Sequence, residues 1–452
     1  MIKGVFIFRR DFRTSDNPAL FKLSKKCDII YPIFILDPNQ IESIYFSPTS
    51  FSFMINSLIS FNKEYLDNKL HVFEGDIILN LKKIKELDYI GFNLDFSEYS
   101  LIRDKLIIDY CNNNKINVIT DGNEMFLNES SLYLKDDGAA YVVFSSYYRN
   151  SMQFNIRKPY SSVTKFKSIE GKSIDLKKIK VTDIIFDCSR LAVNNSLKEI
   201  KKLDYEENRR RIDIDNTMLS PYLKYGIISG AELGLYLKKN KLFDILRQLH
   251  FRNFYFLIRK YNSFGFGHID KHYEKLKWKN NLKEYKKMWI DCNTGFPIID
   301  ACVRKLNKTG WINNRSLLLI AFFSVKLLHI DPFHPQIGGQ VATSKKLIFC
   351  CYANNYCNWH FILSIFDWGS MRFSPKSPKA GRKFDVNNIK KLDPELKIIR
   401  EYIPELSTVS DKDVFDWYNK SINYKNIYFQ PMINVITRWK EYEILNNRID
   451  NK

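Results

Sequence analysis

The sequence contains no long uncharged hydrophobic run and no recognisable export signal. A transmembrane helix needs about 18 or more consecutive apolar residues, and no such stretch occurs. The apolar segment Ile2–Phe8 is too short for a signal peptide and runs directly into Arg9 and Arg10. We therefore expect a soluble, intracellular protein with no membrane partner, in a compartment that the sequence does not identify.

Common catalytic and nucleotide-binding motifs are also absent. Neither GxGxxG nor a P-loop motif occurs, and the seven His show neither Ser/His/Asp nor zinc-protease spacing. The eight Cys are scattered, as reduced thiols in a core would be. Cys350, Cys351, Cys357 and His360 lie close together in the sequence, but no Cys follows Cys357. We expect buried thiols there and no metal site.

Acidic residues are outnumbered. The chain has 70 Lys and Arg against 50 Asp and Glu, a net charge of +20 and a pI near 9.3. Such an excess favours a polyanionic partner, with nucleic acid ahead of a membrane surface. The alternative explanation is a compositional bias toward Lys, Asn and Ile, as an AT-rich coding sequence would produce.

The length of 452 residues predicts two or three domains. Over residues 1–125, short apolar strands alternate with helical segments, which is typical of a doubly wound parallel sheet in an α/β domain. Residues 126–199 read as an inter-domain connection. Residues 200–445 have helical periodicity and predict an all-α domain.

The most unusual stretch runs from Thr294 to Trp359. Thr294–Ala301, the pair Asn314-Arg315 and the amide-rich segment Ala353–Trp359 place polar side chains among very apolar helices. Polar groups are costly to bury unless something bonds them. The pattern therefore predicts the wall of a pocket.

From Thr294–Ala301 through Asn314-Arg315, the chain resembles the photolyase/cryptochrome family, and the resemblance covers nearly the whole chain. Further segments are similar to family motifs and occur in the family's order: 8–20, 143–148, 219–226, 382–385 and 402–406. The resemblance implies a helical domain that binds FAD, a basic face that receives DNA, and a second, antenna chromophore of unknown identity. In repair members, light-excited reduced FAD donates an electron to a pyrimidine dimer flipped into the pocket.

The resemblance also implies which residues bind FAD. Asn216 and Thr217 would cap a helix beginning at Leu219, whose backbone N–H groups would face the pyrophosphate. Arg252 would either pair with FAD phosphate or hold its helix in place. The full set of implied cofactor-binding residues is Tyr205, Asn216, Thr217, Leu219, Ser220, Gln248, Arg252, Tyr255, Cys351 and Asn355.

The residues expected to contact DNA or the lesion are Arg209, Gln248, Phe251, Asn314, Arg315, Phe361 and Arg372. Dimer-repairing members usually carry Glu at the position of Gln248 and Trp at that of Phe251. Gln248 favours a (6-4) photoproduct as substrate. Asn314-Arg315 favours a cyclobutane dimer, because (6-4) photolyases carry a His pair where this chain has Asn313-Asn314.

Three residues are implied to be catalytic. Asn355 would face flavin N5, while Trp359 and Trp278 would be the ends of a three-Trp path for photoreduction. The middle position falls on Pro332, beside Phe333, so either a Tyr elsewhere substitutes or reductants in the cell take over. We expect Trp289 and Trp311 to be core residues.

Charged residues that usually support the flavin are replaced here by Leu317, Phe349 and Cys351. Losing both members of an ion pair is the pattern expected if apolar packing replaced them. From the family resemblance and the pair Asn314-Arg315, we predict a monomeric enzyme that repairs cyclobutane pyrimidine dimers. The alternatives are a (6-4) photolyase and a cryptochrome-like light sensor or non-catalytic DNA-binding relative.

Overall fold

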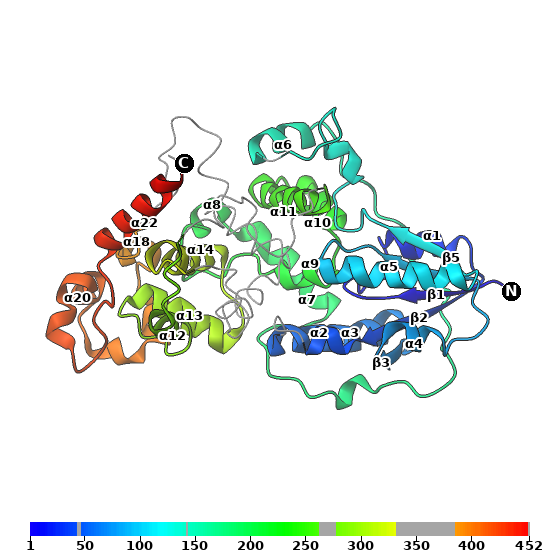
Figure 1. Ribbon diagram of the computed structural model, residues 1–452, viewed down its shortest axis with the longest axis horizontal. Helices are drawn as coiled ribbons and strands as arrows, with labels where there is room; N and C mark the ends of the chain where they lie inside the picture. Colours follow the sequence, from blue (N-terminus) through cyan, green and yellow to red (C-terminus); the bar gives the residue numbers. More distant parts are fainter. Residues whose placement is uncertain (43–46, 142, 262–276, 331–384, 451–452) are drawn as a thin grey trace. The chain divides into compact units, whose positions relative to one another are not determined.

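The computed structural model describes residues 1–42, 47–141, 143–261, 277–330 and 385–450 (Figure 1). Within these ranges the chain forms two compact units. The first comprises residues 1–202 and 219–261, and the second comprises residues 203–218, 277–330 and 385–450.

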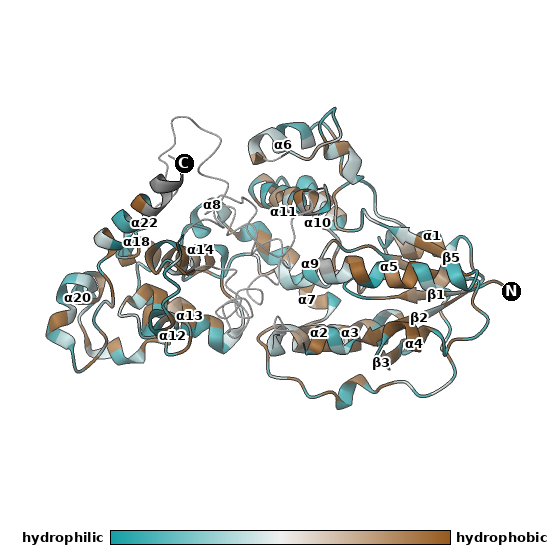
Figure 2. Ribbon diagram, viewed as in Figure 1, coloured by the Kyte–Doolittle hydropathy of each residue, from teal (hydrophilic) through white to brown (hydrophobic). Residues whose placement is uncertain are grey.

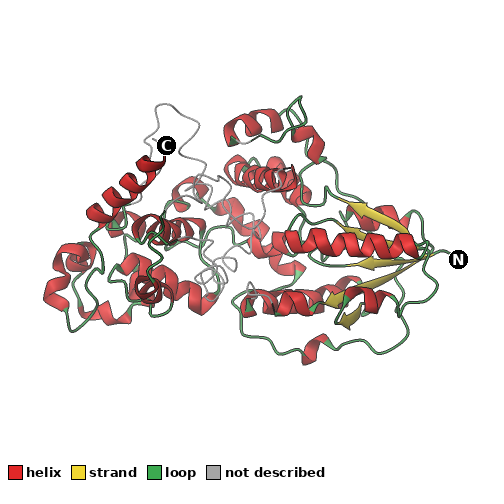
Figure 3. Ribbon diagram, viewed as in Figure 1, coloured by secondary structure: helices red, strands yellow, loops and turns green. Residues whose placement is uncertain are grey.

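The first unit is built on a parallel β-sheet, drawn in yellow in Figure 3. In the part of the chain that the structure describes, five strands pair in the order β3-β2-β1-β4-β5. Their bounds are Lys3–Ile7 (β1), Ile29–Leu36 (β2), His71–Glu74 (β3), Tyr89–Asn93 (β4) and Asn117–Asp121 (β5). This confirms the predicted doubly wound α/β domain.

The sheet forms because its central strands are apolar on both faces. Val5 and Phe6 of β1, Ile33 of β2, and Ile90 and Phe92 of β4 are each no more than 3% exposed. Strands covered by helices on both sides lose the polar alternation of a half-exposed sheet, and β1 is accordingly brown in Figure 2.

Helices connect the strands, and polar residues begin most of them. Asn17 accepts a hydrogen bond from the backbone N–H of Leu20, and Pro18 occupies the first turn, as Asp16-Asn17-Pro18 would suggest. The connecting helices are α1 (Pro18–Ser24), α2 (Pro38–Ile41), α3 (Pro48–Tyr65), α4 (Ile77–Leu81) and α5 (Glu98–Asn113).

Residues 126–199 pack back onto the sheet unit. Ile30 of β2 forms an isolated parallel bridge with Phe166, and Ile174 N–H donates to the carbonyl oxygen of Val72. The remaining elements of this unit are η1 (Ser130–Tyr133), α6 (Phe144–Ser151), η2 (Leu176–Lys178), α7 (Arg190–Glu199), η3 (Ile200–Lys202), α9 (Ser220–Lys224), α10 (Gly230–Lys239) and α11 (Phe243–Tyr261). The compact units thus divide the chain differently from the predicted domain boundaries, which stay a prediction from the sequence pattern.

The described part of the second unit is helical. Its core is formed by α13 (Pro297–Thr309) and α14 (Asn314–Phe322), which continues as a π-helical turn at Phe323–Leu327. From Ser316 to Leu327 the side chains are mostly apolar and all are buried. The other elements are α8 (Tyr205–Asn208), α12 (Leu282–Trp289), α18 (Ile389–Leu392), α19 (Lys397–Tyr402), η7 (Pro404–Thr408), α20 (Asp411–Phe415), α21 (Trp417–Lys420), η8 (Ser421–Tyr424) and α22 (Val435–Asp450). Within the described ranges, no helix has the length and apolarity needed to cross a membrane.

Asp393 is a fully buried carboxyl group before α19. One of its oxygens accepts a hydrogen bond from Ile399 N–H at 2.9 Å. Burial raises the pKa of Asp393 to about 6, although the backbone N–H of Ile399 acts in the opposite direction, and the charge of Asp213 raises it further. The folded protein therefore holds a proton on Asp393 at pH values where the unfolded chain has released it.

We expect Asp393→Asn to change the pH dependence of stability. Because the pKa is raised from 3.8 to about 6 on folding, the Asp393 contribution to the free energy of unfolding falls as pH rises through that window, by on the order of 2–3 kcal/mol. Urea unfolding measures the free energy of unfolding of both proteins. The value for the native protein minus that for the variant should decrease by this amount between pH 4 and pH 7. A difference independent of pH would show that Asp393 does not titrate in this window.

Candidate functional site

The stretch Thr294–Ala301 bonds its buried polar groups to one another. The Asp300 carboxylate, which is 0% exposed, accepts hydrogen bonds from Thr294 N–H (3.0 Å), Thr294 Oγ1 (2.7 Å), Gly295 N–H (3.1 Å) and the Tyr428 hydroxyl. Burial raises the pKa of Asp300, and the hydrogen bond from Tyr428 opposes that shift. The carboxylate therefore closes the turn that begins α13.

Gly295 lets a distant segment pass directly over this turn. Its φ is +75°, and a Cβ atom would lie 2.0 Å from the carbonyl oxygen of Gln430. Met432 N–H donates to Thr294 O at 2.9 Å beside it. Thr294–Ala301 thus fastens the C-terminal segment of the second unit.

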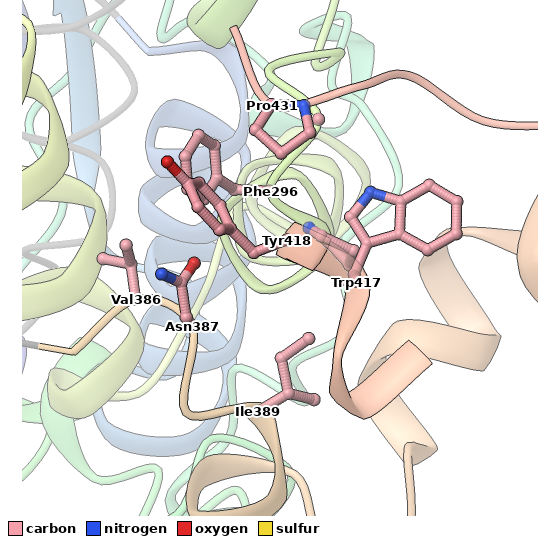
Figure 4. A pocket seen from close by; sticks show the side chains of 9 residues that line it. Phe296, Val386, Asn387, Ile389, Trp417, Tyr418 and Pro431 are labelled. Carbon is pink, nitrogen blue, oxygen red and sulfur yellow. The ribbon is translucent and has the colours of Figure 1, made fainter. Parts of the chain in front are cut away.

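The prediction that the stretch Thr294–Trp359 forms the wall of a ligand pocket stays a prediction, because residues 331–359 lie outside the described residues. Figure 4 shows the hollow beside Thr294–Ala301, with Phe296 and Pro431 facing Trp417 and Tyr418. Its cavity volume is about 10 Å³, which is enough for about one water molecule. Spacing in the sequence does not reveal that Thr294 and Asp300 bond each other.

We expect Gly295→Ala to destabilise the protein by at least about 2 kcal/mol, because the new Cβ would overlap backbone atoms. Gly138→Ala is the matched control, since Gly138 also has positive φ (+78°) but its Cβ would meet no described atom within 4 Å. The control should lose only about 1 kcal/mol. Urea unfolding of both variants makes the comparison, and equal losses would contradict the steric explanation.

The opening motif 8–20 forms a buried polar network at the carboxyl end of β1. Asn93 Nδ2 donates to Asp11 Oδ2 (2.6 Å) and to Asn17 Oδ1 (2.8 Å). The Arg13 guanidinium donates to Gly226 O (3.0 Å) and to Glu124 Oε1 (2.7 Å). The first and third family-like segments, 8–20 and 219–226, therefore meet within the first unit.

The predicted cap of α9 is wrong. The helix spans Ser220–Lys224, and its N-cap is Leu219, which makes no side-chain capping hydrogen bond. Met218, directly before it, takes a left-handed conformation with φ +46°. Asn216 and Thr217 therefore precede a turn and do not cap the helix. Leu219 is buried and Ser220 is half-buried.

Tyr205, Arg209 and Asn216 lie in the second unit. Tyr205 begins α8, and Arg209 follows the helix and forms a half-exposed ion pair with Glu206 at 3.3 Å. Asn216 Nδ2 donates to Ile214 O, while its buried Oδ1 has no hydrogen-bond partner among the described residues. An orphaned acceptor fits a hydroxyl or amino donor of a bound ligand, so this segment is compatible with FAD.

Asn313 holds the start of α14 against the same segment. Its Oδ1 accepts from Ser316 N–H at 2.9 Å, and its Nδ2 donates to Ile214 O at 2.9 Å. Asn314 is exposed and Arg315 half-buried on the first turn that Asn313 positions. The structure thus brings the expected lesion-binding pair close to Asn216. The sequence analysis missed this capping function, although an Asn directly before an apolar run is a helix-start signal.

Gln248, Phe251, Arg252 and Tyr255 share α11 in the first unit. Gln248 is half-buried and bonds the Asp244 carbonyl, and Phe251 stacks on Phe144. Arg252, 8% exposed, donates to the carbonyl oxygens of Met125 (2.7 Å) and Leu223 (3.4 Å). Of its two expected functions, holding the helix is the one that these contacts show, and contact with FAD phosphate stays a prediction.

Several expectations about packing are confirmed. Trp289 and Trp311 are core residues, 0% and 5% exposed, and the described Cys are free and buried. Leu317 is 3% exposed, as apolar replacement of a charged residue requires. Trp278 is half-buried in the segment before α12.

The other predicted positions lie outside the described residues: Pro332, Phe333, Phe349, Cys350, Cys351, Asn355, Cys357, Trp359, His360, Phe361 and Arg372.

Comparison with known proteins gives a consistent result. Residues 4–163 match the family model of DNA photolyase, and residues 245–443 match that of the FAD-binding domain of DNA photolyase. A deoxyribodipyrimidine photo-lyase of Buchnera aphidicola subsp. Acyrthosiphon pisum is 30% identical over 96% of this chain and 94% of its own. The chain belongs to the photolyase/cryptochrome family. Its helical second half is the FAD-binding part of that family's fold.

Other similar proteins include a deoxyribodipyrimidine photo-lyase of Buchnera aphidicola subsp. Baizongia pistaciae, 29% identical over 94% of each chain. The crystal structure of an archaeal photolyase from Sulfolobus tokodaii with two FAD molecules has a TM-score of 0.85 and 30% identity, over 99% of this chain and 100% of that one. A (6-4)DNA photolyase and Cryptochrome-2, both from Arabidopsis thaliana, are 24% identical over 90% of this chain and cover 80% and 71% of their own lengths. Family membership therefore leaves open which lesion, if any, this member repairs.

Proposed function

We propose that this family member splits cyclobutane pyrimidine dimers in DNA, with FAD as its cofactor. The observation that carries the proposal is Asn314-Arg315 on the first turn of α14, accessible and positioned by Asn313. An amide and a guanidinium there offer hydrogen bonds to pyrimidine carbonyl oxygens and to phosphate. The net charge of +20 supports binding to a polyanion.

The residues of this chain would bind and orient the two ligands. Asn216, with its orphaned acceptor, and Tyr205 would hold FAD from the second unit. Gln248 and Phe251 on α11 would meet the flipped bases, by hydrogen bonding and by stacking. Bound reduced FAD supplies the light-driven electron for the reaction, and the side chains supply position and electrostatics.

A (6-4) photoproduct is the second candidate substrate. Gln248 favours it, because its amide hydrogen-bonds base edges without carrying charge. A cryptochrome-like light sensor is the third candidate, favoured by the apolar Leu317 at a position that usually carries a charge near the flavin.

A second chromophore would bind at the carboxyl edge of the sheet. A hollow there is lined by the ends of β1 and β2 and by Asp37, Tyr99 and Arg103. Ligands of open parallel sheets bind outside the carboxyl ends of the strands. The Nε and Nη2 atoms of neighbouring Arg9 are buried and have no hydrogen-bond partner among the described residues, so a ligand group that accepts hydrogen bonds would be favoured.

The purified protein should carry FAD and, under blue light with a reductant, restore DNA that contains cyclobutane dimers. An absorption spectrum and repair assays on the two lesion types measure this. Repair of (6-4) photoproducts alone would select the second candidate. A folded, colourless protein without flavin would exclude both repair functions.

We expect Arg315→Ala to weaken binding to dimer-containing DNA by about 1–3 kcal/mol and binding to undamaged DNA by less, because Arg315 contacts the lesion as well as phosphate. Titration of labelled DNA in the dark measures both affinities. Lys412→Ala, on the exposed surface of α20, is the control because it removes the same charge. It should change the affinity for either DNA by less than Arg315→Ala changes the affinity for dimer-containing DNA. If Arg315→Ala lowers both affinities equally, the residue contacts phosphate only.

A further inference from the structure

In the first unit, α6 packs beside α11 (Figure 1). Their contact contains an aromatic cluster with a buried inner side and a more exposed outer side. On the inner side, Tyr147 and Phe254 are 0% and 3% exposed and hold the helices together. The outer rings are half-buried: Phe144, Tyr148, Phe251 and Tyr255. Because the inner rings already provide a core, the outer rings call for a separate explanation.

The outer rings are nearly parallel. Phe144 and Tyr148 on α6 stack with an interplanar angle of 18°, and Phe251 and Tyr255 on α11 stack with an angle of 13°. Each pair is four residues apart, so each lies along one face of its helix. The two pairs meet at Phe144 and Phe251, whose centroids are 3.3 Å apart with an angle of 8°. The centroids within the α6 pair are 5.4 Å apart and those within the α11 pair 6.4 Å apart, so the rings of each pair are parallel but offset, and Phe144 and Phe251 are the two that overlap face to face.

An exposed cation lies over these rings. The Arg247 guanidinium is 5.5 Å from the ring centroids of Phe144 and Phe251 and 5.8 Å from that of Tyr148. Such distances are those of cation–π contacts. Arg247 is four residues before Phe251 and four after Phe243, which is 54% exposed. One face of α11 thus presents a cation and aromatic rings to solvent in alternate turns.

We propose that Phe144, Tyr148 and Arg247 extend the lesion site at Phe251 into a platform for an unpaired DNA base beside the dimer, on the same strand. Stacked aromatic rings with an adjacent cation are how proteins bind single-stranded DNA, because every base has a π-face and a neighbouring phosphate. The proposal rests on the proposed function, and it makes DNA with an unpaired neighbouring base the better substrate.

The test compares single-stranded and duplex DNA that carry one cyclobutane thymine dimer, bound in the dark. Phe144→Leu and Tyr148→Leu should lower affinity for the single strand by roughly fivefold to a hundredfold. Affinity for the duplex, where the neighbouring base is paired, should change less. Tyr65→Leu, which removes a 42% exposed ring on α3, is the control and should change neither.

Two further readouts separate stacking from a structural effect. A 2-aminopurine placed directly beside the dimer in the single strand should be quenched on binding the native protein and less quenched by Phe144→Leu. Arg247→Gln, a change at an exposed side chain, should reduce the slope of log affinity against log salt by about one, while the ring variants leave that slope unchanged.

The outcomes are distinguishable. Equal effects of the ring variants on single-stranded and duplex DNA, or none, would overturn the platform, provided that native protein binds and repairs the lesion. Failure of the native protein to do so would overturn the proposed function itself. Bound flavin and thermal unfolding verify that each variant is folded. If Phe144→Leu does not fold, Arg247→Gln decides, and an unchanged salt slope then refutes the proposal.

Discussion

Arg13 is a buried charge on which the assembly of the first unit depends. A guanidinium removed from water is strongly destabilising unless it is paired and hydrogen-bonded. Here it is 4% exposed and bonds Glu124, the carbonyl of Asp16 and the carbonyl of Gly226. Burial alone would lower the pKa of Arg13, but the carboxylates of Glu124, Asp16 and Asp11 together outweigh it and the pKa is raised. The segment with the family-like motif 219–226 is thus held to the sheet unit by a hydrogen bond from this buried charge.

Gly226 shows how closely that contact is made. A Cβ there would lie 2.5 Å from Arg10 O and 2.6 Å from Arg13 Nη1. The motif residues of the first unit therefore form hydrogen bonds and close packing contacts with one another. The same is true of Thr294, Gly295 and Asp300 in the second unit. The side chains expected to meet ligands are the neighbours that these internal contacts position, such as Asn314 beside Asn313.

The sheet could be predicted from the sequence because strands buried on both faces, such as β1 and β2, are uninterrupted apolar runs. The start of α1 at Asn17-Pro18 follows from cap chemistry, which is equally local. The cap predicted for α9 was wrong because it depends on a backbone angle that the sequence pattern does not reveal. Met218 has a positive φ directly before α9, which places Asn216 and Thr217 in a turn outside the helix. In the same way, the spacing of Thr294 and Asp300 does not reveal that their partners belong to the chain itself. The long side chain of Arg252 reaches carbonyl groups of residues 125 and 223, which no local pattern reveals.

The order of the strands has a consequence for synthesis on the ribosome. β1 pairs with β4, so the centre of the sheet cannot close until residue 93 has emerged, and parallel pairs of this separation form slowly. Arg13 gains its last partner only with Gly226. A nascent chain that ends before residue 226 therefore carries an incompletely paired charge within a nearly complete sheet. The first unit is complete only when α11 has also been translated, because Arg252 of that helix bonds Met125 and Leu223. The vectorial order of synthesis is therefore part of how this protein reaches its fold.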